Sequence, residues 1–159
     1  MSIDSLKELM NSFDLADYLP QLDTLTGKVE LLLRIAVMVG PLVLLAMGLI
    51  YFLAAPQEAN YQLGYRCYYG MGSVEAWQFT QKLAGTVWSV LGLALAIVMA
   101  LIVNRYRGME MMDMVMSAAK CLLWEIGLTA VSVLGINITA MVMYDSRGRR
   151  RVYGKKNEA

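Results

Sequence analysis

Three long apolar stretches constrain this chain more than any other feature of its sequence. Residues 35–57 and 83–104 contain no charged side chain, and residues 121–144 contain one, Glu125. A helix needs about 20 apolar residues to cross a bilayer core of about 30 Å. We therefore predict an all-α polytopic membrane protein with about three transmembrane helices. The predicted spans are residues 31–55, 83–103 and 121–144, and Gly40-Pro41 predicts a kink in the first of them.

The charges are few and segregated. Only 17% of the residues are charged, whereas a soluble domain carries about 25%. Residues 1–27 hold five acids and one lysine, and residues 145–159 hold six bases and two acids. Charge gathered at opposite ends of an apolar chain is typical of orientation in a membrane and argues against nucleic acid as a partner.

The residues that most enzymes use are missing or scarce. The chain has no histidine and two cysteines, Cys67 and Cys121. This excludes Ser-His-Asp and Cys-His arrangements and the usual zinc sites. We predict no catalytic residues, no cofactor and no metal site. One disulfide is arithmetically possible, but a loop cysteine and a cysteine at the start of an apolar stretch favour two free thiols.

Outside the spans we distinguish an N-terminal extension, residues 1–30, and a basic polar tail, residues 145–159. Apolar residues at helical spacing predict an amphipathic helix over residues 2–20, ended by Pro20. This helix can lie on the bilayer surface or pack on a partner or on the protein's own loops. Thr24 to Gly27 is expected to be a short break, and the tail is expected to be partly disordered. Between them lies the membrane domain, residues 31–144.

Small residues recur every three or four positions along the second span. In lipid, such a stripe lets two helix backbones approach closely. We expect this face to contact another helix, within the protein or in a homo-oligomer, and the alternative is a chance scatter. The stripe consists of Gly85, Ser89, Gly92, Ala96 and Ala100.

Residues 105–120 read as an interfacial connection rich in methionine. A metal-binding methionine cluster is conceivable, but flexible apolar filling is a much better explanation.

Two polar residues stand within the third span. A carboxylate there is expensive and suggests a functional site, so Glu125 is a candidate. The alternative is that Glu125 lies one turn from the end of the span and reaches water or a nearby base. Asn137 is a candidate for an interhelical hydrogen bond, with a structural role.

The loop before the second span carries a resemblance. Asn60, Gly64, Tyr65 and Arg66 form the pattern N-x-x-x-G-Y-R. With this pattern, residues 60–92 resemble the signature of the SdpI family of bacterial membrane proteins, in which a threonine follows the arginine. Residues 144–150 are similar to the family's F-D-x-x-G-x-R ending. Cys67 stands where the pattern has threonine, so a hydroxyl beside Arg66 is missing. The matching residues are Asn60, Gly64, Tyr65, Arg66, Met71, Trp77, Phe79, Lys82, Gly85, Trp88 and Gly92.

The loop residues admit two interpretations. Tyr65 and Trp77 have the character of interfacial anchors. Alternatively, Arg66 belongs to a structured loop that fixes the first two spans together, with Trp77 packed over it and Glu75 as its partner. We take Asn60, Gly64, Tyr65, Arg66, Trp77 and Lys82 as the candidate binding or structural loop. Ser73 is the expected N-cap of a helix that begins in this loop.

The resemblance implies a function without chemistry. The best-known member of the family is an immunity protein, which protects its producer against a secreted toxin and sequesters a transcriptional repressor at the membrane. By this resemblance the partners are the lipid bilayer, a peptide or protein toxin and a cytoplasmic regulator, and the location is the bacterial plasma membrane. An accessory or oligomeric subunit of a transport complex is the alternative, with Glu125, Asn137 and Arg66 lining a polar pathway.

The basic residues give an orientation. With three spans, the first loop and the tail share one side, which holds eight bases against six on the other. Bases near the spans favour the cytoplasmic side. We expect a cytoplasmic C-terminus and first loop.

Overall fold

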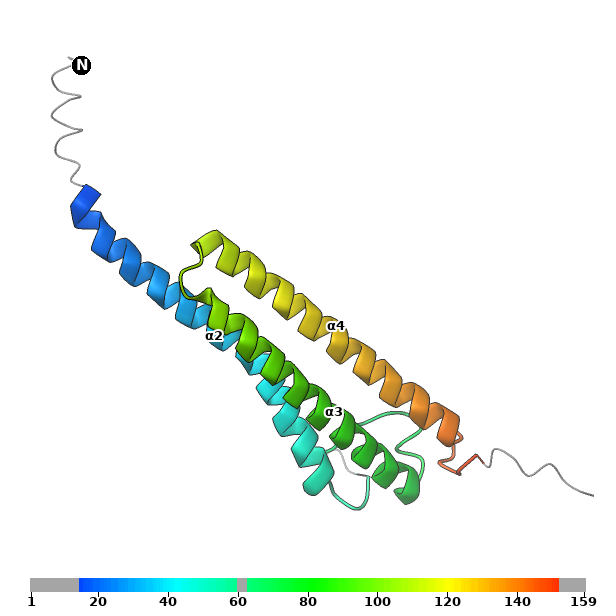
Figure 1. The fold of residues 1–159 in the computed structure, drawn as a ribbon. Helices are drawn as coiled ribbons and strands as arrows, with labels where there is room; N and C mark the ends of the chain where they lie inside the picture. The colour runs from blue at the N-terminus through cyan, green and yellow to red at the C-terminus, as the bar shows by residue number, and fades with distance from the viewer. Residues whose placement is uncertain (1–14, 60–62, 152–159) are drawn as a thin grey trace, which may run out of the picture.

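Three long helices make up most of the part of the chain that the structure describes. The computed structural model describes residues 15–59 and 63–151, and within them the helices are α2 (Leu15–Leu53), α3 (Val74–Val103) and α4 (Met111–Met143). A short 3-10 helix, η1 (Asn104–Tyr106), follows α3 directly. The three helices run side by side (Figure 1). The predicted all-α fold is confirmed.

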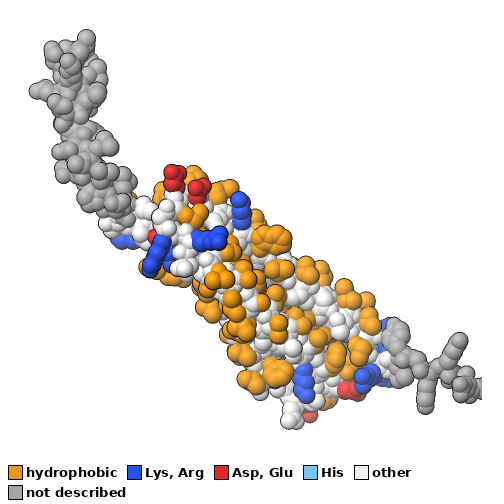
Figure 2. All heavy atoms as spheres, viewed as in Figure 1, with side chains coloured by type: hydrophobic (Ala, Val, Ile, Leu, Met, Phe, Trp, Pro, Cys, Tyr) orange, Lys and Arg blue, Asp and Glu red, His pale blue; other side chains and the backbone are white. Residues whose placement is uncertain are grey.

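The surface of the bundle is that of a membrane protein. Each helix contains a segment long and apolar enough to cross a bilayer: Thr24–Leu53, Val74–Tyr106 and Met111–Met143. Apolar side chains cover the middle of the molecule, and the charged side chains gather towards its two ends (Figure 2). Large apolar residues such as Leu101 and Val131 are more than 60% exposed. Lipid is the solvent that favours such a surface, and the protein is a multi-pass membrane protein.

The helices extend beyond the predicted spans. α3 begins at Val74, and Ser73 caps it as predicted, its Oγ accepting a hydrogen bond from the Ala76 backbone N–H at 3.1 Å. α4 begins at Met111, so the predicted connection of residues 105–120 is wrong over its second half. Charged residues mark the point at which a helix leaves the hydrocarbon core of the bilayer. The helix continues beyond that point because each added residue gains a backbone hydrogen bond.

The break predicted before the first span is also absent. α2 continues through Pro20 and through Thr24 to Gly27, so the proposed boundary at residue 30 falls within one helix. A single glycine costs a helix about 1 kcal/mol, which is too little to interrupt 39 residues of continuous helix. α2 also continues through Pro41. The part of the predicted amphipathic helix before residue 15 lies outside the described residues.

α2 and α3 form the closest pair of helices because small residues line their contact. A Cβ atom on Gly92 would lie 2.5 Å from the Leu45 backbone nitrogen, and one on Gly85 would lie 2.6 Å from that of Phe52. Gly48 of α2 is equally close to the backbone of Ser89. The stripe thus packs on α2 of the same chain, with Ala96 buried and Ala100, at its end, exposed.

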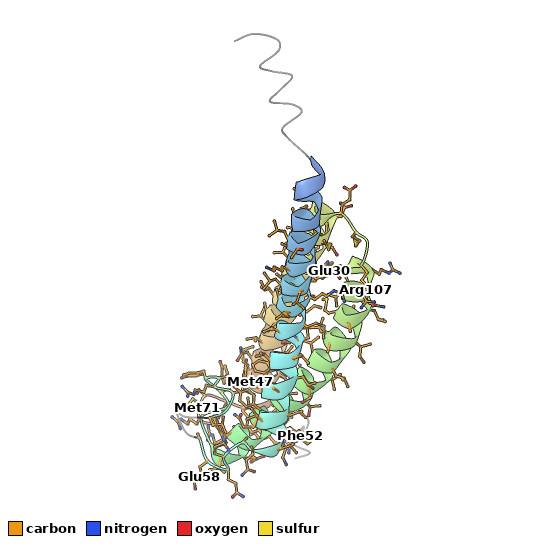
Figure 3. The ribbon with its side chains drawn as sticks, turned by 90° about the vertical axis from the view of Figure 1, so that its left-hand side faces the viewer. Glu30, Met47, Phe52, Glu58, Met71 and Arg107 are labelled. Atoms are coloured by element: carbon orange, nitrogen blue, oxygen red, sulfur yellow. The ribbon has the colours of Figure 1, made fainter. Side chains whose placement is uncertain are left out.

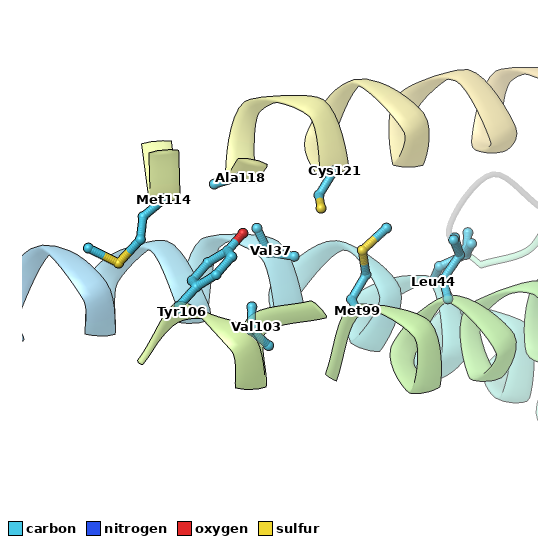
Figure 4. Close-up of a cluster of buried hydrophobic side chains, with 9 residues drawn as sticks. Val37, Leu44, Met99, Val103, Tyr106, Met114, Ala118 and Cys121 are labelled. Atoms are coloured by element: carbon cyan, nitrogen blue, oxygen red, sulfur yellow. The ribbon is translucent and has the colours of Figure 1, made fainter. Parts of the chain in front are cut away.

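α4 contributes to a buried apolar cluster at the end of the bundle where α3 is followed by η1. Met114, Ala118 and Cys121 of α4 point towards Tyr106 and Val37 (Figure 4). Both cysteines are buried and free, in agreement with the sequence-based expectation.

Candidate functional site

The first loop and the residues after α4 lie at the same end of the bundle. Figure 3 shows Glu58 and Met71 at this end, with Glu30 and Arg107 at the opposite one. We call residues 63–73 and 144–151 together the platform. Its position agrees with the expectation that three spans put the first loop and the tail on one side.

Trp77 ties the platform to the ends of α2 and α3. Its side chain is fully buried, and its Nε1–H donates a hydrogen bond to the backbone oxygen of Pro56 at 2.8 Å. The ring lies against Gly64, whose φ of +125° and lack of a Cβ permit the contact. The interpretation of Trp77 as an interfacial anchor is therefore wrong. Its ring packs on Gly64, two residues before Arg66.

Gln81 of α3 holds the backbone of Tyr65. Its Oε1 accepts a hydrogen bond from the Tyr65 N–H, and its Nε2 donates one to the Tyr65 C=O, both at 2.7 Å. Gln81 is 2% exposed and Tyr65 is 8% exposed. Two hydrogen bonds to one residue fix the loop on the helix in the manner of a strand pair, and they satisfy backbone groups that would otherwise be buried without partners.

The Tyr65 side chain reaches α4. Its ring meets that of Trp88 edge to face with centroids 5.4 Å apart, and its hydroxyl donates to the Val133 backbone oxygen at 3.3 Å. Asn137 of α4 lies close enough to this hydroxyl to influence its pKa. Burial raises the pKa of Tyr65 above its usual value. Tyr65 is thus a buried contact between the loop and two helices, and its interpretation as an interfacial anchor is wrong.

Cys67 takes over the part that a threonine hydroxyl plays in a tight turn. Its Sγ accepts a hydrogen bond from the Gly70 N–H at 3.2 Å, and its backbone oxygen accepts one from Met71 at 3.2 Å. Side-chain oxygens of serine and threonine close such turns in the same way. The departure from the family pattern therefore keeps the turn.

The beginning of the tail is folded, and the prediction of disorder is wrong for residues 145–151. Asp145 Oδ1 accepts hydrogen bonds from the Arg147 and Arg149 N–H groups at 2.9 and 2.8 Å. The Arg149 Nε–H donates to Asp145 Oδ2 at 2.9 Å, and Gly148 adopts a φ of +70°. The chain then turns back, and Tyr144 forms an antiparallel bridge with Arg150. Residues 152–159 lie outside the described part.

This turn docks on the first loop. The Ser73 hydroxyl donates a hydrogen bond to the Gly148 backbone oxygen at 2.7 Å. Gly72 and Gly148 approach so closely that a Cβ on either would lie about 2.5 Å from backbone atoms of the other segment. The rings of Phe79 and Tyr144 add a contact with centroids 5.5 Å apart. Segments 75 residues apart in sequence thereby form one unit.

The outer face of the platform is basic and aromatic. Tyr68 is 74% exposed, and the exposed arginines are Arg66, Arg147, Arg149, Arg150 and Arg151. Lys82 lines a small hollow of about 300 Å³ between the end of α2 and the start of α3, next to Pro56 and Gln78. Glu75, the proposed partner of Arg66, lies close to the Tyr144 hydroxyl, and burial together with this neighbouring carboxylate raises the pKa of that hydroxyl. Asn60 lies outside the described residues.

Glu125 stands deep in the bundle. It lies 14 residues after the start of α4, which is about four helical turns, and it is 6% exposed. The helix begins before Lys120, which lies exposed on its surface, so Glu125 is not near the helix end. Its distance from the end of the span, one turn as predicted, stays a prediction. Glu125 and Arg66 are on different elements, and Glu125 lines a cavity that Arg66 does not reach.

The comparison with protein families matches the part of the chain that contains the first loop of the platform. The sequence pattern of the SdpI/YfhL protein family matches residues 57–144, more than half of the chain. The chain belongs to the SdpI/YfhL family. No curated protein and no solved structure gave a match. The SdpI/YfhL segment begins at the loop, includes α3 and α4, and ends at Tyr144, where the docked turn starts.

Gln81, which holds the SdpI/YfhL platform, escaped the sequence analysis, and Asp145 and Gly148 were matched to the family's ending without a structural role. Gln81 was not singled out because a glutamine near a helix start carries no distinctive pattern. Asp145 and Gly148 had a usable signal, since an Asp followed three residues later by Gly is typical of a turn closed by the carboxylate. That signal predicts a turn, but it does not predict that the turn docks on Ser73.

Proposed function

We propose that this SdpI/YfhL protein acts by binding and carries out no catalysis, as a toxin-immunity protein that also holds a cytoplasmic regulator at the membrane. The observation that carries the proposal is the platform, a folded surface built from the family's own loop and closed by the tail turn. A surface held in one conformation loses little entropy when a partner binds. The absence of histidine from the sequence adds to the case against catalysis.

The face of the platform favours an acidic protein partner. Arg66, Arg147 and Arg150 are exposed, and guanidinium groups bind carboxylates through paired hydrogen bonds. Tyr68 adds an exposed aromatic ring, the residue type enriched in interfaces. We propose that this end of the molecule faces the cytoplasm of a bacterial cell, because bases near the spans favour that side.

Immunity is tested by survival. The gene is deleted in its native bacterium, and cells are exposed to medium conditioned by the parent strain while viable counts and membrane potential are measured. We expect the deletion strain to lose viability at least tenfold and the wild-type gene to restore it. Equal survival of parent and deletion strains in every conditioned medium would contradict the immunity role.

Sequestration is tested by transcription. Wild type, Arg147→Ala/Arg150→Ala and Arg107→Ala are expressed in the deletion strain at matched membrane levels, and transcripts are measured. Arg107 is exposed at the opposite end of the bundle and serves as the control. We expect a set of transcripts that responds to wild type and to Arg107→Ala but not to the double variant. Identical responses to all three proteins would contradict a regulator bound at the platform.

A second candidate function, a subunit of a transport complex, is favoured by Glu125. This carboxyl group lines a cavity within the bundle, as groups on substrate pathways do. Three spans are few for a carrier, so this function requires assembly with other subunits or copies. Flux into liposomes that is lost on Glu125→Gln would support it, and flux that is unchanged would exclude this role for the residue.

A further inference from the structure

A cavity of about 880 Å³ lies between the three helices. Its walls come from the stretch Val39–Met47 of α2, from Trp88 and Leu95 of α3, and from residues 125–134 of α4. Almost all of these side chains are apolar, and Glu125 is the single ionisable group among them. None of the residues that form the platform lines the cavity, so a ligand bound there is independent of the immunity and sequestration functions, whereas the transport alternative shares Glu125.

The Glu125 side chain has an oxygen without a partner. Oε1 is buried and forms no hydrogen bond within the part of the chain that the structure describes. On its other side the carboxyl group lies against Gly40, where a Cβ would be 2.5 Å from Oε2. The absence of a side chain at Gly40 thus leaves room for the carboxyl group at one end of the cavity. The Cys121 thiol, one turn earlier on α4, is a titratable neighbour of this carboxyl group.

A buried carboxyl group without a partner indicates the chemistry of the group that would bind beside it. Charges in apolar surroundings are costly unless they are paired and hydrogen-bonded, and polar groups in membrane spans are found with partners. The other cavity walls offer no cation. A donor that carries positive charge therefore complements this site better than any other group.

The remaining walls define the rest of the ligand. Val39, Val43 and Leu134 are at least half exposed, so the cavity opens sideways to the lipid phase. The lining stretches of α2 and α4 correspond to about 12–14 Å along the helices. The cavity therefore admits a long apolar group from the bilayer, with its polar end at Glu125.

We propose that this cavity binds a lipophilic amine, a molecule with one ammonium group that pairs with Glu125 and an apolar body that lies along α2 and α4. A lipid acyl chain alone fits the apolar walls but leaves Oε1 without a donor. The carboxyl group thus gives the site a preference for the amine over an alcohol of the same length.

The test uses the full chain in zwitterionic nanodiscs with two matched probes, decylamine and decanol. Trp88 lines the cavity, so binding is followed by tryptophan fluorescence and by the shift in thermal unfolding. We expect saturable binding of decylamine at least tenfold tighter than that of decanol. Glu125→Gln should lose the tenfold preference while decanol binding is unchanged, and the exposed Glu110→Gln should behave as wild type.

A second variant covers the case in which Glu125→Gln does not fold. Gly40→Ala places a methyl group where the carboxyl group now lies, and it should weaken decylamine binding severalfold with little effect on decanol. Equal affinity for the two probes, an unchanged preference in both variants, or no saturable binding of decylamine to the wild type would overturn the proposal.

Discussion

Gln81 and Tyr65 are joined by two hydrogen bonds of 2.7 Å, one to the N–H and one to the C=O of the same tyrosine. This pair fixes the first loop on α3 and brings the Tyr65 ring between Trp88 and α4. The loop is therefore part of the folded core at this end of the bundle and is no simple connection between spans.

Replacing Gln81 by alanine should destabilise the protein. The substitution leaves the buried N–H and C=O of Tyr65 without partners, and each unsatisfied group costs about 1–3 kcal/mol. We expect a loss of about 2–4 kcal/mol in the free energy of unfolding, measured by denaturation in detergent. Gln78→Ala is the matched control, because this exposed side chain makes one long hydrogen bond, to the Gln57 C=O at 3.3 Å, and its loss should cost less than about 0.5 kcal/mol. Equal effects of the two variants would contradict the importance of the Gln81 contact.

A side chain at Gly92 should force α2 and α3 apart. Its Cβ would lie 2.5 Å from the Leu45 backbone, which cannot move without shifting the helix. Gly92→Ala is expected to cost about 1–3 kcal/mol by overpacking. Gly127→Ala provides the contrast, since nothing lies within 4 Å of its Cβ position, and alanine is favoured over glycine in a helix by about 1 kcal/mol. Thermal unfolding of the two variants should shift in opposite directions, and a neutral Gly92→Ala would show that the helices pack less closely.

The turn that Asp145 closes should loosen in acid. Hydrogen bonds from Arg149 and Arg147 lower the pKa of the Asp145 carboxyl below its ordinary value. A group whose pKa is lower in the folded state stabilises that state above its unfolded pKa, and the contribution disappears as the pH falls through the folded pKa. The Arg147 and Arg149 amide resonances should therefore titrate with a midpoint below the ordinary value of about 3.9. A midpoint clearly above that value, or resonances that do not respond to this carboxyl, would contradict the turn.

The helices and the membrane fold could be predicted from the sequence because long uncharged apolar runs indicate helices that lie in the hydrocarbon core of the bilayer. The ends of the helices could not, because charge marks the edge of the hydrocarbon and not the end of a helix. Lys120 ended the predicted span, although α4 continues past it to Met111. For the same reason the predicted span gave no indication that Glu125 lies about four turns inside the helix.

The parts of the platform were recognised, but their assembly was not. The residue pattern around Gly64 and Arg66 identified the family, and Ser73 was expected to cap α3. The Ser73 hydroxyl also donates to the Gly148 C=O, a contact across 75 residues that depends on a left-handed glycine. Such long-range contacts leave no periodic signal in a single sequence, so the fold of residues 145–151 could not be predicted within a tail that was expected to be partly disordered.

Hydrogen exchange measured by mass spectrometry on the full chain in nanodiscs tests most directly that the loop and the tail form one folded platform. The account predicts slow exchange for residues 145–151, where Gly148, Arg149 and Arg151 amides donate to Asp145 and Met143, and faster exchange of both platform segments together in Ser73→Ala. Exchange of residues 145–151 at the rate of an unstructured peptide in the wild type would contradict it.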